Sequence, residues 1–149
     1  YPNSELRIVG VGYELQNLKN LTKEIQINKK VKFLGKKSRS DIINEYNSCN
    51  SFIYASSFET FGVIFVEAMA LGRPIISLNC GSSNEIISKK TGIIVKNKKS
   101  EDMSSAMITL YENYSSYDPN KIREYCKSLF SEKKLSLKMI SHYKNVLHQ

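Results

Sequence analysis

Short apolar segments alternate with helical patterns along the whole chain, and this alternation limits the possible folds most strongly. Each segment is a continuous run of four to six mainly apolar residues, many of them β-branched. Such runs predict strands that are covered on both faces. The expected strands are residues 5–10, 31–35, 51–56, 74–79 and 92–95. The order predicts an α/β fold: a Rossmann-like, doubly wound parallel sheet flanked by helices.

The length and composition indicate one domain of a soluble, cytoplasmic protein. A chain of 149 residues is long enough for one core but hardly for two. It contains neither an apolar run of 18 residues nor a secretory leader. Its three cysteines are odd in number and far apart, which is typical of reduced thiols. Because the first residue is Tyr1 and not Met, we expect a piece of a longer protein.

The basic charge lies at the two ends of the sequence. The formal net charge is +8, with +4 in residues 1–50, zero in residues 51–95 and +4 in residues 96–149. A nucleic-acid-binding protein usually concentrates its charge on one element, with aromatic residues between the charges. We therefore expect no nucleic-acid partner. Solvated lysines account for the excess, while weak attraction to phosphates or to an anionic membrane surface stays open.

The first strand is followed by a partial match to a dinucleotide fingerprint. The segment IVGVGYEL contains Gly10 and Gly12, but Leu15 stands where the third glycine belongs. The second strand, in VKFLGKK, is not followed by an acidic residue for a ribose. The sequence therefore argues against a domain that binds NAD or FAD.

The segment ASSFETFGVIFVEAMALGRPIIS, residues 55–77, joins the third strand to an apolar helix. In a parallel sheet the ligand lies at the carboxyl ends of the strands. The backbone N–H groups of residues 60–63 would point out of the helix N-terminus and form an anion site. Gly62 would let a ligand approach the backbone closely, and Glu59 would stand at the mouth of this site.

Glu67 is the one polar residue between Gly62 and Gly72. At helical spacing it lies opposite Phe65 and Met69, which should face the sheet, and it shares a face with Val63 and Ala70. An unpaired buried carboxylate is costly, so Glu67 must reach solvent or a polar partner. Its two oxygens suit the vicinal hydroxyls of a ribose, but an ordinary surface glutamate accounts for the pattern equally well.

A short helix is expected after the fourth strand. Ser82 and Glu85 have the spacing of a capping box over the segment SNEIIS.

The spacing of Glu59 and Glu67, E-TFGVIFV-E, lies within FETFGVIFVEAMALGRPII, which is followed by SSNEII and TGIIV. This resembles the C-terminal, donor-binding domain of retaining glycosyltransferases with the GT-B fold, the "group 1" enzymes of family 4. The resemblance covers most of the chain.

The resemblance implies a role for each matched residue. Glu67 would hold the ribose hydroxyls of a nucleotide-sugar donor linked to UDP or GDP. Glu59 would contact the transferred sugar at the reacting centre, which makes it the candidate catalytic residue. Thr60, Phe61 and Gly62 would contact sugar hydroxyls and phosphate, and the loop at Gly35 and Lys36 would border the base. The resemblance implies transfer to an acceptor hydroxyl with no metal and no further cofactor.

The chain also departs from the family pattern. The family domain opens with a strand and a G-R…K-G context for the diphosphate, which is not found here upstream of LRIVG. Residues 1–149 should therefore form a nucleotide-sugar-binding domain that is incomplete at its N-terminus, with unpaired strand edges and little activity alone. A saccharide or lipid-linked acceptor would bind through an N-terminal domain that is absent. The implied setting is surface polysaccharide or glycolipid synthesis, in the cytoplasm or at the inner face of the membrane.

Three other functions stay open at this point. One is a non-catalytic module of the same fold, against which the intact Glu59, Gly62 and Glu67 argue. Another is a basic α/β domain that binds polyanions, and the third is an epimerase that acts on nucleotide sugars.

Overall fold

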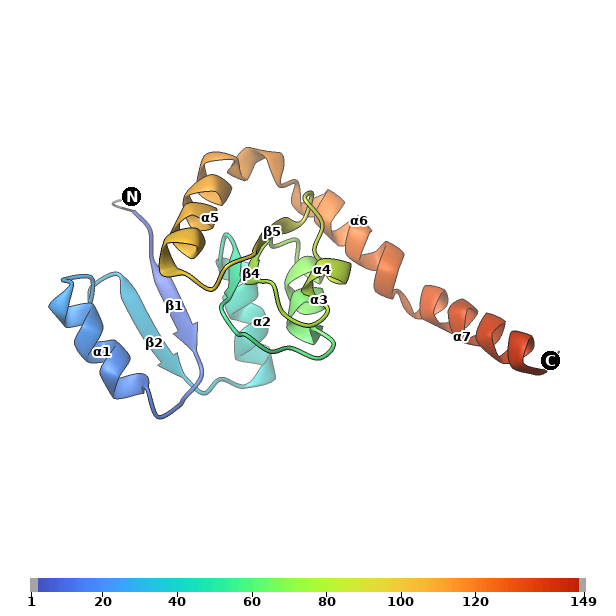
Figure 1. Ribbon diagram of the computed structural model, residues 1–149, viewed down its shortest axis with the longest axis horizontal. Coiled ribbons are helices and arrows are strands. Elements are labelled where there is room, and N and C mark those ends of the chain that lie inside the picture. The colour runs from blue at the N-terminus through green and yellow to red at the C-terminus, as the bar shows by residue number, and fades with distance from the viewer. Residues whose placement is uncertain (1–2, 148–149) are drawn as a thin grey trace. The chain divides into compact units, whose positions relative to one another are not determined.

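The computed structural model describes residues 3–147 and confirms the α/β class: every strand is parallel to its neighbour and helices connect the strands (Figure 1). The elements in chain order are β1 (Leu6–Val9), α1 (Leu15–Glu24), β2 (Val31–Gly35), α2 (Arg39–Ser48), β3 (Phe52–Tyr54), α3 (Val63–Ala70), β4 (Ile75–Leu78), α4 (Ser83–Ile86), β5 (Gly92–Val95), α5 (Ser100–Glu112), a 3₁₀ turn (Tyr114–Ser116), α6 (Pro119–Phe130) and α7 (Glu132–Leu147).

The five expected strands are all present, but they form two sheets. β1 pairs with β2 in one sheet, and the other has the order β3-β4-β5. The chain correspondingly forms two compact units, one up to Glu45 and the other from Tyr46 onward, so the boundary falls within α2. Each unit is described by itself below.

The first unit is a parallel strand pair with its connecting helix. Leu6 lies opposite Val31, and the register shifts between Ile8 and Val9, which lies opposite Gly35. Ion pairs add to the backbone pairing: Arg7 contacts Glu45 at 2.9 Å, and Lys32 contacts Glu5 at 2.7 Å. These pairs are partly exposed and contribute little to stability.

The second unit contains most of the buried core, with β4 at its centre. All four residues of β4 are buried, as expected for a strand covered on both faces. Ile76 and Leu78 pack with Val95 of β5 and with Ala106 and Leu110 of α5. Because side chains alternate along a strand, Ile75 and Ser77 point to the other face. α3 contacts β4 and α6, and Figure 1 shows α3 and α5 on opposite sides of β4.

The C-terminal residues form two helices, α6 and α7, separated at Ser131. Asp118 caps α6 by accepting a hydrogen bond from the backbone N–H of Asn120 at 2.8 Å. No helix within residues 3–147 combines the length and apolar character needed to cross a membrane.

Candidate functional site

The helix that carries Glu67 begins at a glycine with left-handed backbone geometry. Gly62 precedes α3 with a φ of 84°. A Cβ at this position would lie 2.6 Å from the ring of Phe65 and 3.1 Å from the Ser82 hydroxyl. Only glycine fits both the backbone angle and the space, so Gly62 fixes how the chain enters α3.

The carboxylate of Glu59 lies at the start of α3. Its Oε1 accepts hydrogen bonds from the backbone N–H groups of Thr60 at 2.9 Å and of Gly62 at 3.1 Å. Its Oε2 accepts a hydrogen bond from the hydroxyl of Tyr54 at 3.0 Å. The Gly62 N–H, and then the Tyr54 hydroxyl, hold the pKa of Glu59 below its ordinary value. Glu59 is therefore an anion near neutral pH, held by two of the backbone donors expected to receive a ligand.

The loop after β4 holds the Glu59 loop from the other side. Gly81 has a φ of 44°, and a Cβ there would overlap with the backbone carbonyl of Glu59. The Ser82 hydroxyl donates a hydrogen bond to the carbonyl oxygen of Phe61. The expected capping box is thus wrong for Ser82, because its side chain bridges two loops and makes no capping bond to α4.

Gly81→Ala should destabilise the protein and displace Glu59, because the added methyl group cannot share space with the Glu59 carbonyl. We expect the free energy of unfolding to fall by about 1–3 kcal/mol, the cost of a strained backbone with steric overlap. Urea unfolding followed by circular dichroism measures the change.

Gly12→Ala is the matched control, because a Cβ at Gly12 meets nothing within 4 Å. It should change the free energy of unfolding by less than about 0.5 kcal/mol. Equal stability of the two variants would contradict the close packing of the two loops.

The burial pattern of α3 agrees with the expected orientation of Glu67. Phe65 and Met69 are fully buried, whereas Val63 is 54% exposed and Ala70 is exposed. Glu67, on the same side as Val63 and Ala70, is partly exposed. Burial and, in second place, the charge of Glu67 raise the pKa of Tyr46. Glu67 therefore lies close enough to a phenol to act on it electrostatically and is not sealed in the core.

Aromatic rings connect this helix to β3. The ring of Tyr54 makes an edge contact with Phe65 of α3 at 5.3 Å and stacks on Phe52 at 6.3 Å. Phe52 in turn makes an edge contact with Tyr46 at 5.3 Å. These contacts fix the end of β3, from which the Glu59 loop leaves, against the start of α3.

The remaining residues of the expected site fall into both units. Thr60 and Phe61 lie beside Glu59 and are exposed, with the ring of Phe61 against Phe130 of α6 at 6.0 Å. Gly35 ends β2 in the first unit, where its carbonyl accepts a hydrogen bond from the N–H of Gly10 at 2.8 Å, and Lys36 is exposed. Glu59, Thr60 and Gly62 therefore lie together in the second unit, whereas Gly35 and Lys36 belong to the first unit.

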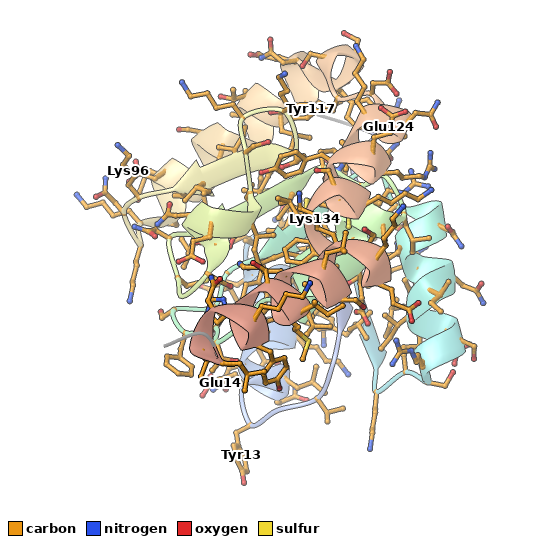
Figure 2. The ribbon with its side chains drawn as sticks, turned by 90° about the vertical axis from the view of Figure 1, so that its right-hand side faces the viewer. Tyr13, Glu14, Lys96, Tyr117, Glu124 and Lys134 are labelled. Carbon is orange, nitrogen blue, oxygen red and sulfur yellow. The ribbon has the colours of Figure 1, made fainter. Side chains whose placement is uncertain are left out.

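The other strand ends carry exposed side chains. Tyr13, in the loop after β1, projects into solvent, and Lys96 extends outward from the end of β5 (Figure 2). Two hollows of the second unit lie along α7 and beside β5, and the expected site residues line neither of them.

Sequence reasoning missed Tyr54 and Gly81 as contributors to the site. The strand pattern accounted for Tyr54 as an apolar residue, although a tyrosine five positions before a glutamate offers a donor within reach. Gly81 lies in a loop, where no hydrophobic periodicity indicates which residues are structurally important. Its requirement arises from a tertiary contact that only the folded chain shows.

Comparison with known families decides the class of the chain. Residues 1–129 match the model of the family "Glycosyl transferases group 1". The chain belongs to this family. It is 33% identical over 119 residues to an uncharacterized glycosyltransferase of Haemophilus influenzae, covering 78% of this chain and 33% of that protein. It is 29% identical over 119 residues to a GDP-mannose-dependent phosphatidylinositol monomannoside mannosyltransferase of Corynebacterium glutamicum, covering 75% and 31%.

Solved glycosyltransferase structures share the fold. The sucrose-phosphate synthase of Thermosynechococcus elongatus aligns with a TM-score of 0.79 at 22% identity, over 97% of this chain and 39% of that one. HepE of Anabaena in complex with UDP aligns with a TM-score of 0.80 at 20% identity, over 97% and 42%. The chain thus has the Rossmann-like architecture of one half of a GT-B enzyme and spans about a third of its curated relatives. The roles assigned to individual site residues stay predictions.

Proposed function

We propose that this group 1 glycosyltransferase chain is the donor-binding domain of a retaining enzyme, which moves a sugar from a UDP- or GDP-linked donor to an acceptor hydroxyl. One observation supports the proposal: the two glutamates of the E-x7-E motif lie on either side of the start of α3, Glu59 in the loop before it and Glu67 within it. Glu59 is held as an anion at the start of α3, and Glu67 lies on its solvent side.

The names of similar proteins support a nucleotide-sugar donor. One relative is described as GDP-mannose-dependent, and HepE was crystallised with UDP and with UDP-glucose. A pneumococcal O-GlcNAc transferase with a TM-score of 0.76 was solved with UDP and GlcNAc. Because these donors contain either uracil or guanine, we propose that the donor is a nucleotide sugar and do not choose between the two bases.

The chemistry of transfer fits the residues at α3. The reaction separates a diphosphate from a sugar that gains positive charge at its anomeric carbon. A carboxylate beside the sugar ring stabilises that charge, and a helix N-terminus favours the departing anion. We assign the first task to Glu59 and the second to the start of α3 at Thr60, Phe61 and Gly62. Because the N–H groups of Thr60 and Gly62 donate to Glu59 in this structure, a bound diphosphate would share these donors with Glu59 or take them over. Glu67 would accept hydrogen bonds from the ribose hydroxyls, and Gly35 and Lys36 would border the base. We propose no metal and no further cofactor.

We propose a saccharide or lipid-linked acceptor that binds through a second domain, in polysaccharide or glycolipid synthesis. Such an acceptor would place the enzyme in the cytoplasm, in part at the inner face of the membrane.

A saturation-transfer NMR screen of the full-length protein tests this function. UDP- and GDP-sugars should show saturation at ribose and sugar protons, whereas AMP should respond much less, because it has a ribose but neither a diphosphate nor a transferred sugar. The same screen should include heparin at low and high salt. Salt-sensitive heparin binding, together with no response to any nucleotide sugar, would favour a polyanion-binding domain and contradict the proposal.

A further inference from the structure

Among residues 3–147, Tyr54 is the one residue outside the Glu59 loop whose side chain donates a hydrogen bond to the Glu59 carboxylate. The Tyr54 hydroxyl oxygen lies 3.0 Å from Oε2 of Glu59. The other donors, the backbone N–H groups of Thr60 and Gly62, donate to Oε1. The two oxygens therefore have separate partners. The loop backbone holds Oε1, and a β3 side chain holds Oε2.

This division determines what each partner contributes. Donors that meet one oxygen leave the carboxylate free to turn about that contact. A second donor on the other oxygen removes this freedom and fixes the plane of the carboxylate. Catalysis depends on such orientation, because a charged group stabilises a transition state only from the correct direction and distance.

Tyr54 is itself held firmly enough to position another group. Its ring lies between Phe52 and Phe65, at centroid distances of 6.3 and 5.3 Å. Its backbone belongs to β3, where it lies opposite Ser77 of the buried strand β4. The hydroxyl thus projects from a packed strand, whereas the carboxylate that it contacts lies on a loop.

We propose that Tyr54 is a positioning residue for Glu59: its hydroxyl orients the carboxylate for the sugar at the reacting centre. The effect of Tyr54 on catalysis rests on the proposed function. The contact between Tyr54 and Glu59 does not, and it can be tested without an activity assay. It adds to the site a residue outside the E-x7-E motif.

The protonation states fit this role. A hydrogen bond with Ser56 lowers the pKa of Tyr54, whereas burial and the Glu59 carboxylate raise it. The two upward effects together outweigh the downward one, so the pKa of Tyr54 lies above its ordinary value. The phenol therefore stays protonated and donates. The same hydrogen bond lowers the pKa of Glu59, so its removal should move the pKa of Glu59 upward.

Tyr54→Phe in the full-length protein separates positioning from packing, because it removes the hydroxyl and keeps the ring between Phe52 and Phe65. We expect kcat to fall about tenfold, the lower end of the effect of losing one hydrogen bond to a charged group. The Kd for the free nucleotide should change less than about twofold, because no nucleotide contact is lost. The acid limb of the kcat profile should move to higher pH, because Glu59 loses a hydrogen bond that favours its charged form.

Tyr114→Phe is the matched control, because it removes a tyrosine hydroxyl that donates to the carbonyl oxygen of Asn50 at 3.3 Å, apart from Glu59. It should leave kcat, the acid limb and nucleotide affinity unchanged. A merely structural role for the Tyr54 hydroxyl would lower thermal stability without moving the acid limb, and this result would overturn the proposal.

A titration of the Glu59 carboxyl by ¹³C NMR distinguishes failure of this inference from failure of the proposed function. The signal is assigned as the one that disappears in Glu59→Gln. An upward shift of its pKa in Tyr54→Phe supports the contact even if no transfer activity is found. An unchanged Glu59 pKa overturns the inference and leaves the glycosyltransferase function intact.

Discussion

Replacing Glu67 with alanine in the full-length protein is expected to weaken the binding of UDP or GDP by about 10- to 100-fold, since a hydrogen bond to a charged group contributes ~1.5–3 kcal/mol. The carboxylate on the solvent side of α3 would lose two acceptor oxygens for the ribose hydroxyls. The fold should survive, because Glu67 is partly exposed and lies opposite the buried Phe65 and Met69. Calorimetric titration with the free nucleotide measures the loss.

Two further variants make this experiment specific. Glu67→Gln keeps one acceptor oxygen and should show an intermediate loss of affinity. Glu124→Ala removes an exposed glutamate from α6 and should bind nucleotide as the wild type does (Figure 2). An unchanged affinity in Glu67→Ala, with a fold shown to be intact by circular dichroism, would count against the assignment of Glu67 to the ribose.

Replacing Glu59 with glutamine should lower the rate of sugar transfer by at least about 100-fold, because the charge that stabilises the developing cation is removed. The affinity for UDP or GDP should change less than about threefold, because the free nucleotide lacks the transferred sugar. Glutamine retains an oxygen that can accept from the N–H groups of Thr60 and Gly62, so the loop should keep its conformation.

The contrast between the two glutamate variants is more informative than either result alone. Glu67→Ala should act mainly on nucleotide binding, and Glu59→Gln mainly on turnover. Thermal unfolding confirms that both variants are folded. If Glu59→Gln retained wild-type turnover, Glu59 would have no part in the chemistry. If it lost turnover and nucleotide affinity equally, Glu59 would be a binding residue.

The periodic parts of the fold were predictable from the sequence. All five strands appear within two residues of the expected bounds, because continuous apolar runs identify strands buried on both faces. The orientation of α3 was also predictable. Phe65 and Met69 are buried opposite Glu67, since burial along a helix follows its 3.6-residue period.

The pairing of the strands was not predictable from periodicity. An apolar run shows that a strand is covered and does not show which strand lies beside it. Pairing depends on the length and path of the connections. The division into a β1-β2 sheet and a β3-β4-β5 sheet therefore became clear only from the folded chain.

The candidate site was predictable in its motif residues and not in their supports. Glu59, Gly62 and Glu67 stand at a fixed spacing beside a strand end, which the sequence shows directly. The contacts of Tyr54 and Gly81 with the Glu59 loop are tertiary. Ser82 stands at the N-cap position of α4 as expected, but its hydroxyl bonds to the neighbouring loop at Phe61 and makes no capping bond to the helix.

A crystal structure of the full-length protein with a bound nucleotide sugar tests the central claim most directly. The Glu67 carboxylate should lie within about 3.2 Å of the ribose hydroxyls, the ordinary hydrogen-bond range. Glu59 should lie beside the sugar ring, with its Oε2 still held by Tyr54. A nucleotide sugar bound elsewhere, with both carboxylates beyond hydrogen-bond reach of it, would contradict the account.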